Sequence, residues 1–374
     1  MPESVDALSR VITDVVAPAA PDVDRLGTFP AASIAALGEA GILGLVSATE
    51  VGGGGGGLDT AASVIEQLAA ACGSTAMIVL MHYASTAVIE AQGAESLRRA
   101  VAAGDHLTTL AFSETGSRSH FWAPQSTATA DGDAVRLDAH KSWVTAAGHA
   151  ATYVWSSRPL AADGPMTLWA VPSDSPGLGV AGPFDGFGLR GNDSTPVTAD
   201  GVRVGRDTML GADGAGLDLA LTAVLPWFLV LSAAFSLGIM EAITAETHGH
   251  LLATRLEHLD QSLVQQVLPR VDFARMRIET DRTRAFVDDT LSALGTGRPD
   301  AMLRVLEIKA AAAESAISVT EQAMKLCGGA AFRKEVGIER RFRDARAARV
   351  MAPTTDALLD FVGRAVFELP LLDA

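Results

Sequence analysis

The stretch LTTLAFSE (107–114) marks the point at which the sequence changes from helical to strand patterning. It is followed by the similar segments STATADGDAVRLDA (126–139), KSWVTAA (141–147), TYVWSSRP (152–159) and MTLWAVPS (166–173). These segments are short, rich in Thr, Val and aromatic residues, and separated by Gly, Asp and Pro, which is typical of strands joined by turns. We therefore predict a small antiparallel β-domain at residues 106–210.

Helical patterns lie on both sides of this unit, with apolar residues spaced three and four apart. On the N-terminal side they cover Ser4–Val16, Ala31–Ala40, Leu58–Ala71 and Ser74–Gln92, and on the C-terminal side 215–252, 260–294, 299–327 and 335–366. Because helices and strands are segregated along the chain, the pattern predicts an α+β fold. Its expected parts are an N-terminal helical domain (1–105), the middle β-domain (106–210) and a C-terminal helical bundle (211–374).

Composition excludes several classes of protein. The 374 residues carry 29 Lys and Arg against 44 Asp and Glu, a formal charge of −15, which disfavours binding to nucleic acid or an anionic membrane surface. Only Cys72 and Cys327 are present, and the N-terminus lacks a signal-peptide pattern, so we expect a reducing, cytoplasmic location. The apolar run Ala223–Met240 contains Pro226 and Ser236, and it indicates a buried helix rather than a membrane span.

Common catalytic and nucleotide-binding motifs have no support. The glycine run Gly52–Gly57 satisfies GxGxxG formally, but helical segments follow it where a βαβ unit is needed, which favours an interhelical loop. No GxSxG elbow or Walker lysine loop occurs. His248 and His250 are two residues apart on a helix and face different sides, and there is no CxxC, so we expect no metal site.

Three stretches remain that suit a flat heteroaromatic ligand. AFSETGSRSH (111–120) ends a strand in a polar turn, where the hydroxyls of Ser113 and Ser119 can donate hydrogen bonds. KSWVTAA alternates Trp143 and Thr145 on one strand face, which offers stacking beside a hydroxyl. KLCGGAAF (325–332) carries two glycines at a helix end, where a ligand can approach the backbone closely. Each stretch could instead have a purely structural role. Trp143 could be a core residue, and Gly328 and Gly329 could cap a helix.

Taken together and in order, these stretches resemble the acyl-CoA dehydrogenase superfamily over nearly the whole chain. The resemblance rests on ATEVGGGG (48–55), AFSETGS (111–117), DAHKSWVTAAGHA (138–150), FGLRGNDSTPVTADGVRV (187–204) and KLCGGAAFRKEVGIERRFRDAR (325–346). It implies FAD bound between the β-domain and a four-helix bundle, in a homo-oligomer that is usually a tetramer. The substrate implied is an acyl group on CoA or a carrier protein, with an electron-transfer or reductase partner.

The same resemblance implies roles for residues around the flavin. Phe112 and Ser113 would meet the edge of the isoalloxazine ring, Trp143 would lie against it, and Thr145 would approach N5. The remaining implied flavin contacts are Thr354 within the subunit, and Gly328, Gly329 and Arg255 toward a neighbouring subunit's FAD. Arg255 is the best remnant of the family's RxxFG motif, because Glu257, His258 and Leu259 follow it in place of Phe-Gly.

The sequence departs from the family on the substrate side. The usual proton-abstracting Glu lies in a YEGT motif, and the matching positions here are Met351, Ala352, Pro353 and Thr354. The alternative base position falls near Phe228 or Leu229, which are also apolar. A raised-pKa carboxylate in a dry pocket is the ordinary base for an α-proton, so its loss at both positions indicates an atypical base or changed chemistry.

Two residues remain as candidate bases. Asp356 lies four residues past Ala352 on an expected helix and is the fallback carboxylate. His82 is expected in the inner cavity, on the helix that in this family lines the substrate site, although a packed core histidine fits it equally well. Its neighbour Met81 and the turn residue Ser119 are the expected substrate contacts.

The predicted function is that of an FAD-dependent oxidoreductase that acts on an acyl thioester or a related small substrate by proton and hydride removal. One alternative on the same fold is a flavin-dependent monooxygenase, which dispenses with the Glu and receives reduced flavin from a reductase. The other is a non-catalytic partner subunit of a heteromeric dehydrogenase, which predicts no turnover by the chain alone.

Overall fold

The computed structural model describes residues 2–117 and 120–372. The chain begins with helices that pack around α5, a helix whose residues are buried on every side. A helix that is apolar all round belongs in a core, and α5 lies between the other N-terminal helices, the β-domain and α8. The N-terminal elements are α1 (Pro2–Val11), η1 (Ile12–Val16), α2 (Ala17–Leu26), α3 (Ala31–Glu39), η2 (Leu43–Val46), η3 (Thr49–Val51), α4 (Leu58–Ala71), α5 (Gly73–Gln92) and α6 (Glu95–Ala102).

The glycine run at 52–57 forms the loop between η3 and α4, as the sequence indicated. Its backbone folds back on the preceding segment, and the Gly55 N–H donates to the Ser47 carbonyl at 2.8 Å. A Cβ added at Gly53 would lie 2.2 Å from the same carbonyl oxygen, so a side chain has no room there. Close backbone packing, rather than a phosphate site, accounts for these glycines.

The β-domain consists of two four-stranded sheets, in the orders β1-β4-β5-β8 and β2-β3-β7-β6. Trp155, Trp169, Tyr153 and small aliphatic side chains form the core of this domain. The expectation of purely antiparallel pairing is corrected at one place, because β1 and β4 run parallel. The chain between them crosses through the second sheet, which supplies the long connection that a parallel pair needs. The strands are β1 (Thr108–Ala111), β2 (Thr127–Asp131), β3 (Ala134–Val144), β4 (Thr152–Ser157), β5 (Thr167–Pro172), β6 (Leu178–Val180), β7 (Thr195–Gly205) and β8 (Met209–Leu210).

Long helices make up the C-terminal part, as predicted, but two expected helices are interrupted. The segment expected as a helix from 260 begins in the second half of a hairpin, and the last one breaks into three helices, with Pro353 in the second of the two breaks. The elements are α7 (Gly216–Leu219), η5 (Ala220–Val224), α8 (Leu225–Ala253), β9 (Arg255–Leu256), η6 (Glu257–Leu259), β10 (Gln261–Ser262), η7 (Leu263–Gln265), α9 (Val267–Thr296), α10 (Ala301–Cys327), η8 (Gly328–Phe332), η9 (Lys334–Val336), α11 (Ile338–Asp344), α12 (Ala347–Val350) and α13 (Thr355–Val366).

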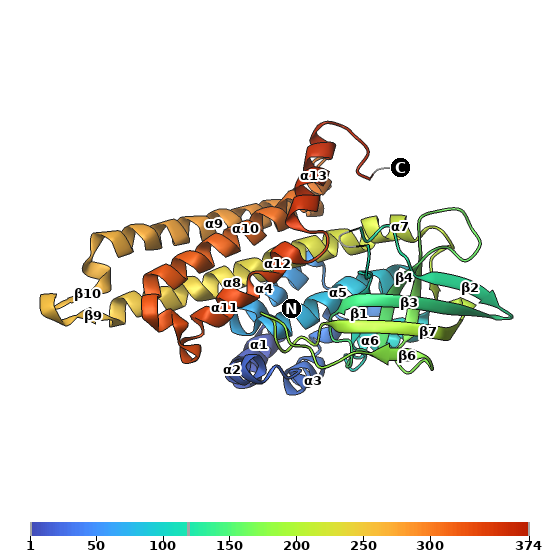
Figure 1. The fold of residues 1–374 in the computed structure, drawn as a ribbon, viewed down its shortest axis with the longest axis horizontal. Coiled ribbons are helices and arrows are strands. Elements are labelled where there is room, and N and C mark those ends of the chain that lie inside the picture. The colour runs from blue at the N-terminus through green and yellow to red at the C-terminus, as the bar shows by residue number, and fades with distance from the viewer. Residues whose placement is uncertain (1, 118–119, 373–374) are drawn as a thin grey trace.

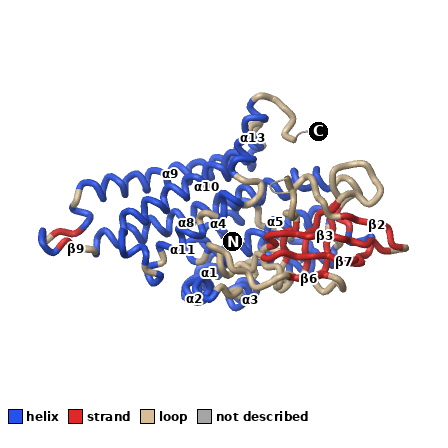
Figure 2. The backbone as a smooth tube through the Cα atoms, in the orientation of Figure 1, coloured by secondary structure: helices blue, strands red, loops and turns tan. Residues whose placement is uncertain are grey.

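The continuous helical stretch Gly216–Ala253 is long and apolar enough to cross a membrane, yet 89% of its most apolar window is buried inside the protein. It therefore acts as the core helix of the bundle, in agreement with the sequence reading of 223–240. Helices α8, α9 and α10 run side by side along the long axis of the molecule (Figure 1). The two sheets gather at one end of this axis and the β9–β10 hairpin at the other (Figure 2).

Candidate active site

A cleft of about 1430 Å³ lies where the β-domain meets the helices. One wall comes from the ends of β1 and β3 and from the loop at 184–194. Met81 of α5 and the start of α8 form the floor, and the segment 347–357 forms the opposite wall. Segments that are far apart in sequence thus meet at one site, as the α+β arrangement requires.

The β-domain wall carries the four residues that the sequence proposed for the flavin ring: Phe112, Ser113, Trp143 and Thr145 all line the cleft. The Thr145 hydroxyl lies 3.1 Å from the Ser194 hydroxyl, which also lines it. The Trp143 side chain is 70% exposed although it is a large aromatic group. An exposed indole in a cleft of this size is available for stacking on a flat ligand.

The expected alternation of Trp143 and Thr145 along one strand face is corrected. The pairing of β3 with β7 shifts register between Lys141 and Val144, and Trp143 has a positive φ of 56°. Such a bulge adds a residue to one strand and re-aims the side chains beside it. As a result Trp143 turns outward into the cleft while Thr145, just past the strand, is 3% exposed.

A buried ion pair that the sequence reading missed supports this wall. The Lys141 ammonium lies 2.5 Å from a carboxylate oxygen of Glu114 and donates to the Ser156 carbonyl at 2.7 Å. Burial lowers the pKa of Lys141 to about 8. Burial alone would raise the pKa of Glu114, but the Lys141 charge and the hydrogen bonds from Lys141, Ser126 and the Gln125 N–H together hold that pKa below its ordinary value. The pair is therefore ionised at neutral pH and ties the turn after β1 to β3 and β4.

The helical wall contains the four residues that the resemblance aligns with the family's YEGT motif. Met351, Ala352, Pro353 and Thr354 all line the cleft, and none of them carries a carboxylate. Asp356 also lines the cleft but is exposed to solvent in the first turn of α13. Phe228, which the resemblance places near the second base position, lines the floor, whereas Leu229 is buried in the core.

Lys309 holds this wall in place from behind. Its ammonium is buried and donates to the carbonyls of Ala348, Met351 and Pro353 at 2.9, 2.9 and 2.7 Å. Burial lowers the pKa of Lys309 to about 7. The sequence could not predict this role for Lys309, because its partners are backbone carbonyls about 40 residues away along the chain.

The expectation that His82 faces the cavity is corrected. The imidazole is fully buried and does not line the cleft. Its Nδ1 accepts from the Thr108 N–H at 3.1 Å, and its Nε2 lies 3.1 Å from the Leu43 carbonyl, so both ring nitrogens are engaged. Burial lowers the pKa of His82 to about 4. Met81, one residue earlier on α5, is the side chain that reaches the cleft.

The three residues expected to contact a neighbouring subunit's FAD, Arg255, Gly328 and Gly329, lie outside the cleft. Arg255 is on the β9–β10 hairpin at the far end of the bundle, where it pairs with Asp260 (Figure 1). Gly328 and Gly329 follow α10, with open space where side chains would be, and none of the three lines the cleft. Ser119, proposed as a substrate contact, lies outside the described residues.

An aromatic wall that sequence reasoning missed closes one side of the cleft. His120, Phe121 and Trp122 line it, and Trp122 lies 4.9 Å from the His120 ring. Trp122 also packs against Phe361 of α13 at 5.5 Å, which joins the β-domain loop to the last helix. The run HFW at 120–122 could have predicted this wall, because consecutive large aromatic side chains in a polar turn need a packing partner.

The residues present fit FAD. Within the described residues, the Asn192 side-chain oxygen and the Thr355 hydroxyl are buried without a hydrogen-bond partner, and both residues line the cleft. Buried polar atoms of this kind are ordinarily satisfied, and the heteroaromatic edge and ribityl hydroxyls of FAD offer suitable partners. Together with the exposed Trp143 indole, they make a polar and aromatic surface suited to an isoalloxazine ring.

Comparison with known proteins agrees with this geometry. Family models for the N-terminal, middle and C-terminal domains of acyl-CoA dehydrogenases match residues 3–104, 109–202 and 214–367. The probable acyl-CoA dehydrogenase YngJ of Bacillus subtilis is 28% identical over 353 residues, covering 91% of each chain. The mitochondrial short-chain specific acyl-CoA dehydrogenase of Bos taurus is 28% identical over 380 residues, covering 95% of this chain and 88% of its own.

The fold agrees as well. Butyryl-CoA dehydrogenase from Megasphaera elsdenii superposes with a TM-score of 0.90 at 22% identity, over 98% of both chains. The glutaryl-coenzyme A dehydrogenase structure gives 0.91 at 20% identity, over 99% of this chain and 95% of its own. Because the models of all three domains match in order along the chain, the chain belongs to the acyl-CoA dehydrogenase superfamily of flavin-dependent oxidoreductases.

Proposed function

We propose that this protein binds FAD in the cleft and oxidises an acyl thioester or a related small acyl substrate. The observation that carries the proposal is the convergence of Phe112, Ser113, Trp143, Thr145 and Thr354 on one cleft, with the Trp143 indole 70% exposed. These side chains come from separate segments, and their meeting point matches the flavin site that the family resemblance implies.

Residues that line the cleft would bind the flavin ring and shield the substrate from water. Trp143 would pack against the ring, and the hydroxyl pair of Thr145 and Ser194 would hydrogen-bond to its edge. When bound, FAD accepts a hydride at N5. The aromatic wall at 120–122 and Phe228 would exclude water from the substrate, which strengthens every polar contact inside the cleft.

The proton side of the reaction departs from the family. By the resemblance, Ala352 and Phe228 occupy the two family base positions, and Asp356 is the carboxylate that lies closest to Ala352 in sequence. We propose Asp356 as the proton acceptor if the substrate is an acyl thioester. Its exposure means that it lacks the dry surroundings that make a carboxylate a strong base, so slow desaturation is expected.

The apolar base positions also favour two other functions on the same fold. Monooxygenation needs reduced flavin from a reductase and no carboxylate at position 352. A non-catalytic partner subunit would complete a flavin site for a chain that has the Glu. The prolyl acyl carrier protein oxidase AnaB, with a TM-score of 0.87 at 18% identity, has a carrier-bound substrate by its name, so a carrier-bound acyl group stays open for this chain.

We further propose a homotetramer, in which Arg255, Gly328 and Gly329 face the FAD of a neighbouring copy. Large apolar side chains are exposed near these residues, with Leu268 at 75% and Phe332 at 83%. Exposed side chains of that size on a soluble chain mark contact surfaces. Electrons would leave through an electron-transfer or reductase partner, and a cytoplasmic location is proposed on the cysteine content alone.

The test is an anaerobic titration of the purified protein with FAD, followed by a panel of acyl-CoA and acyl-carrier substrates. Bound flavin that is bleached by an acyl thioester supports dehydrogenation. Flavin that no acyl thioester bleaches, but that consumes oxygen once a reductase supplies electrons, supports monooxygenation. Flavin binding that needs a second, Glu-containing chain supports the partner-subunit reading, and no flavin uptake under any condition refutes the proposal.

A further inference from the structure

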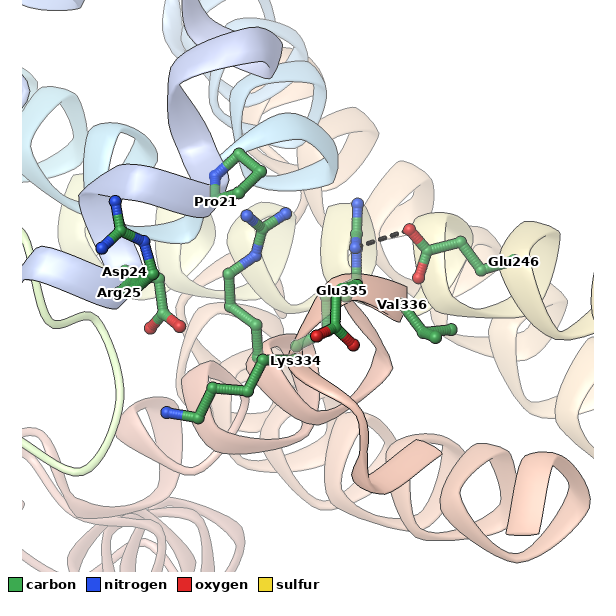
Figure 3. Close-up of a pocket in the computed structure, with 10 residues that line it drawn as sticks. Pro21, Asp24, Arg25, Glu246, Lys334, Glu335 and Val336 are labelled. Carbon is green, nitrogen blue, oxygen red and sulfur yellow. Dashed lines mark ion pairs between the residues drawn. The ribbon is translucent and has the colours of Figure 1, made fainter. Parts of the chain in front are cut away.

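A second pocket, of about 330 Å³, lies between α2, α8 and the segment that runs from η9 into α11 (Figure 3). It shares no lining residue with the flavin cleft. Four basic side chains line it, Arg25, Lys334, Arg340 and Arg341, on a chain whose formal charge is −15. A concentration of cations on an acidic protein is a feature that needs a physical reason.

The three carboxylates of this pocket have partners of their own. Asp24 is bound by both terminal nitrogens of Arg343, at 2.9 and 2.6 Å, and Arg343 lies outside the pocket. Glu335 lies 3.5 Å from Arg333, which is also outside it. Glu246 pairs with Arg341 (Figure 3). The acidic charges are therefore largely neutralised without the help of the other basic residues.

Two of the basic residues are left with little to bind. Lys334 makes no ion pair or hydrogen bond with any described residue, and Arg340 makes only a long contact of 3.4 Å to the Ala71 carbonyl. Arg25 pairs with Asp22 at the surface, where such pairs contribute little. The pocket thus presents free cationic donors to whatever enters it.

Arg341 adds unsatisfied donors in the interior of the pocket. The residue is 9% exposed, and its Nη2 donates to the Ala70 carbonyl at 2.8 Å. Its Nη1 lies 2.7 Å from a Glu246 oxygen as an ion pair but without hydrogen-bond geometry, and its Nε has no partner among the described residues. The other Glu246 oxygen is likewise buried and unpaired. Leaving such groups unsatisfied is costly, so a ligand that fills them is favoured.

Gly337 packs closely against Arg341 at the wall of the pocket. Its φ of +78° is left-handed, and a Cβ there would lie 3.1 Å from Arg341 Nη1.

Burial raises the pKa of Glu246, although the arginines oppose the shift. The pocket therefore offers several donors and one carboxylate acceptor within a small volume.

We propose that this pocket is a binding site for a phosphate group. The negative oxygens of the phosphate would accept from Arg341, Lys334 and Arg340, and one protonated oxygen would donate to Glu246. Charged donors suit phosphate oxygens particularly well. Inorganic phosphate keeps one proton on a large part of its molecules at neutral pH, and a phosphomonoester, whose second pKa is about 6, keeps one in its monoanionic fraction. Sulfate has the same shape but carries no proton at neutral pH, so it leaves Glu246 unsatisfied and faces its charge.

Calorimetric titration at neutral pH in a phosphate-free buffer tests the site, with and without added FAD. The probes are inorganic phosphate, glycerol phosphate and sulfate. The variants are Lys334→Gln and Arg340→Gln, each of which removes one exposed or half-buried charge without opening the core. The control is Arg203→Gln on β7, which removes the same charge from a side chain that is 64% exposed and far from the pocket.

We expect phosphate to bind the wild-type protein and the control alike, and each pocket variant to weaken binding by about tenfold or more, the usual effect of losing a charge-assisted hydrogen bond. Sulfate should bind at least about tenfold more weakly, since it cannot donate to Glu246. Tighter binding of glycerol phosphate than of phosphate identifies a monoester as the ligand, and the reverse identifies the free ion.

Three results would overturn the proposal. They are the absence of phosphate binding, equal affinity in the pocket variants and the control, and release of FAD by phosphate, which would assign the anion site to the flavin cleft. A failure of the protein to bind FAD leaves this test unchanged, because the titration without FAD reports on the pocket alone.

Discussion

The carboxylate of Asp344 accepts a hydrogen bond of 2.7 Å from the backbone N–H of Leu189, and this contact fastens the β-domain to the helical bundle. Leu189 lies in the loop that forms one wall of the cleft, and Asp344 ends α11. Arg343, next to it, donates to the Phe187 carbonyl at 3.1 Å. The position of the cleft wall at 184–194 therefore depends on a buried carboxylate.

That carboxylate should make stability depend on pH. Burial raises the pKa of Asp344 to about 6, from an ordinary value of 3.8. Because the pKa is higher in the folded state, the protonated carboxyl stabilises the folded protein. Its contribution to the free energy of unfolding, about 3 kcal/mol, is fully present below pH 4 and is lost as the pH rises through 6. Asp344→Asn, which can still accept from Leu189, should remove this loss. Urea unfolding at pH 4.5 and 8 checks it, and an identical pH dependence in wild type and variant would contradict it.

His82 should act as a packing residue. Removing its ring in His82→Ala leaves the Thr108 N–H and the Leu43 carbonyl without partners and opens a cavity, at a cost of about 2–5 kcal/mol. His82→Gln, which can keep one of the two bonds, should cost less. The measurements are the unfolding free energy and the FAD affinity of the folded protein. A variant that folds as well as wild type but has lost turnover would restore the catalytic hypothesis for His82.

The histidine also predicts an acid effect of the opposite sign to that of Asp344. Burial lowers the pKa of His82 from 6.5 to about 4. A lowered folded-state pKa means that its contribution is present above pH 6.5 and is lost as the pH falls through 4, by about 3 kcal/mol. The difference in unfolding free energy between wild type and His82→Gln should therefore shrink between pH 7 and pH 4. A constant difference would show that the ring is not held neutral.

Lys309→Met should destabilise the protein by about 2–5 kcal/mol. The methionine fills the same space but leaves the carbonyls of Ala348, Met351 and Pro353 without their donor. Lys325→Met on the same helix is the control, because that lysine is 64% exposed and its buried partner Asp272 keeps a second ion pair with Arg275. Equal urea midpoints for the two variants would show that Lys309 does not hold the cleft wall.

Trp143→Ala should weaken FAD binding by about 1–3 kcal/mol, the value of a buried aromatic contact, while leaving the flavin-free protein as stable as wild type. The side chain is 70% exposed before the ligand binds, so its removal opens no cavity in the core. Phe367→Ala is the control, because Phe367 is 77% exposed and lies outside the cleft. Flavin fluorescence titration measures both. Unchanged affinity in Trp143→Ala would place the flavin elsewhere.

Ala352→Glu should raise the rate of flavin bleaching by acyl-CoA. The new carboxylate would stand on the cleft wall, at the position that the sequence resemblance aligns with the family's base, and a positioned general base contributes about 10²–10⁴-fold. Ala352→Gln has the same size but cannot take the proton, and it serves as the control. Stopped-flow absorbance under anaerobic conditions compares the two. Equal rates in the Glu and Gln variants would show that position 352 does not face the reacting carbon.

The sequence by itself determined the order of domains, and its resemblance to the family predicted which residues would contact the flavin. Strand segments rich in Thr, Val and aromatic residues can be identified from the sequence, because side chains in a strand alternate between its two faces. This alternation predicts which face is buried without knowledge of the partner strand. The motifs around Phe112, Trp143 and Thr354 were identified by resemblance, and they meet in one cleft because the fold brings their segments together.

Only the tertiary structure decided which way individual side chains point. Helix α5 is buried on all sides, so its apolar pattern carries no information about which residue faces the cleft; neighbouring elements place Met81 there and His82 against Leu43 and Thr108. Trp143 turns outward because a bulge forms where β3 pairs with β7, some 50 residues away along the chain. Local periodicity fixes what is buried, whereas orientation within a buried layer depends on contacts between segments that are distant in sequence.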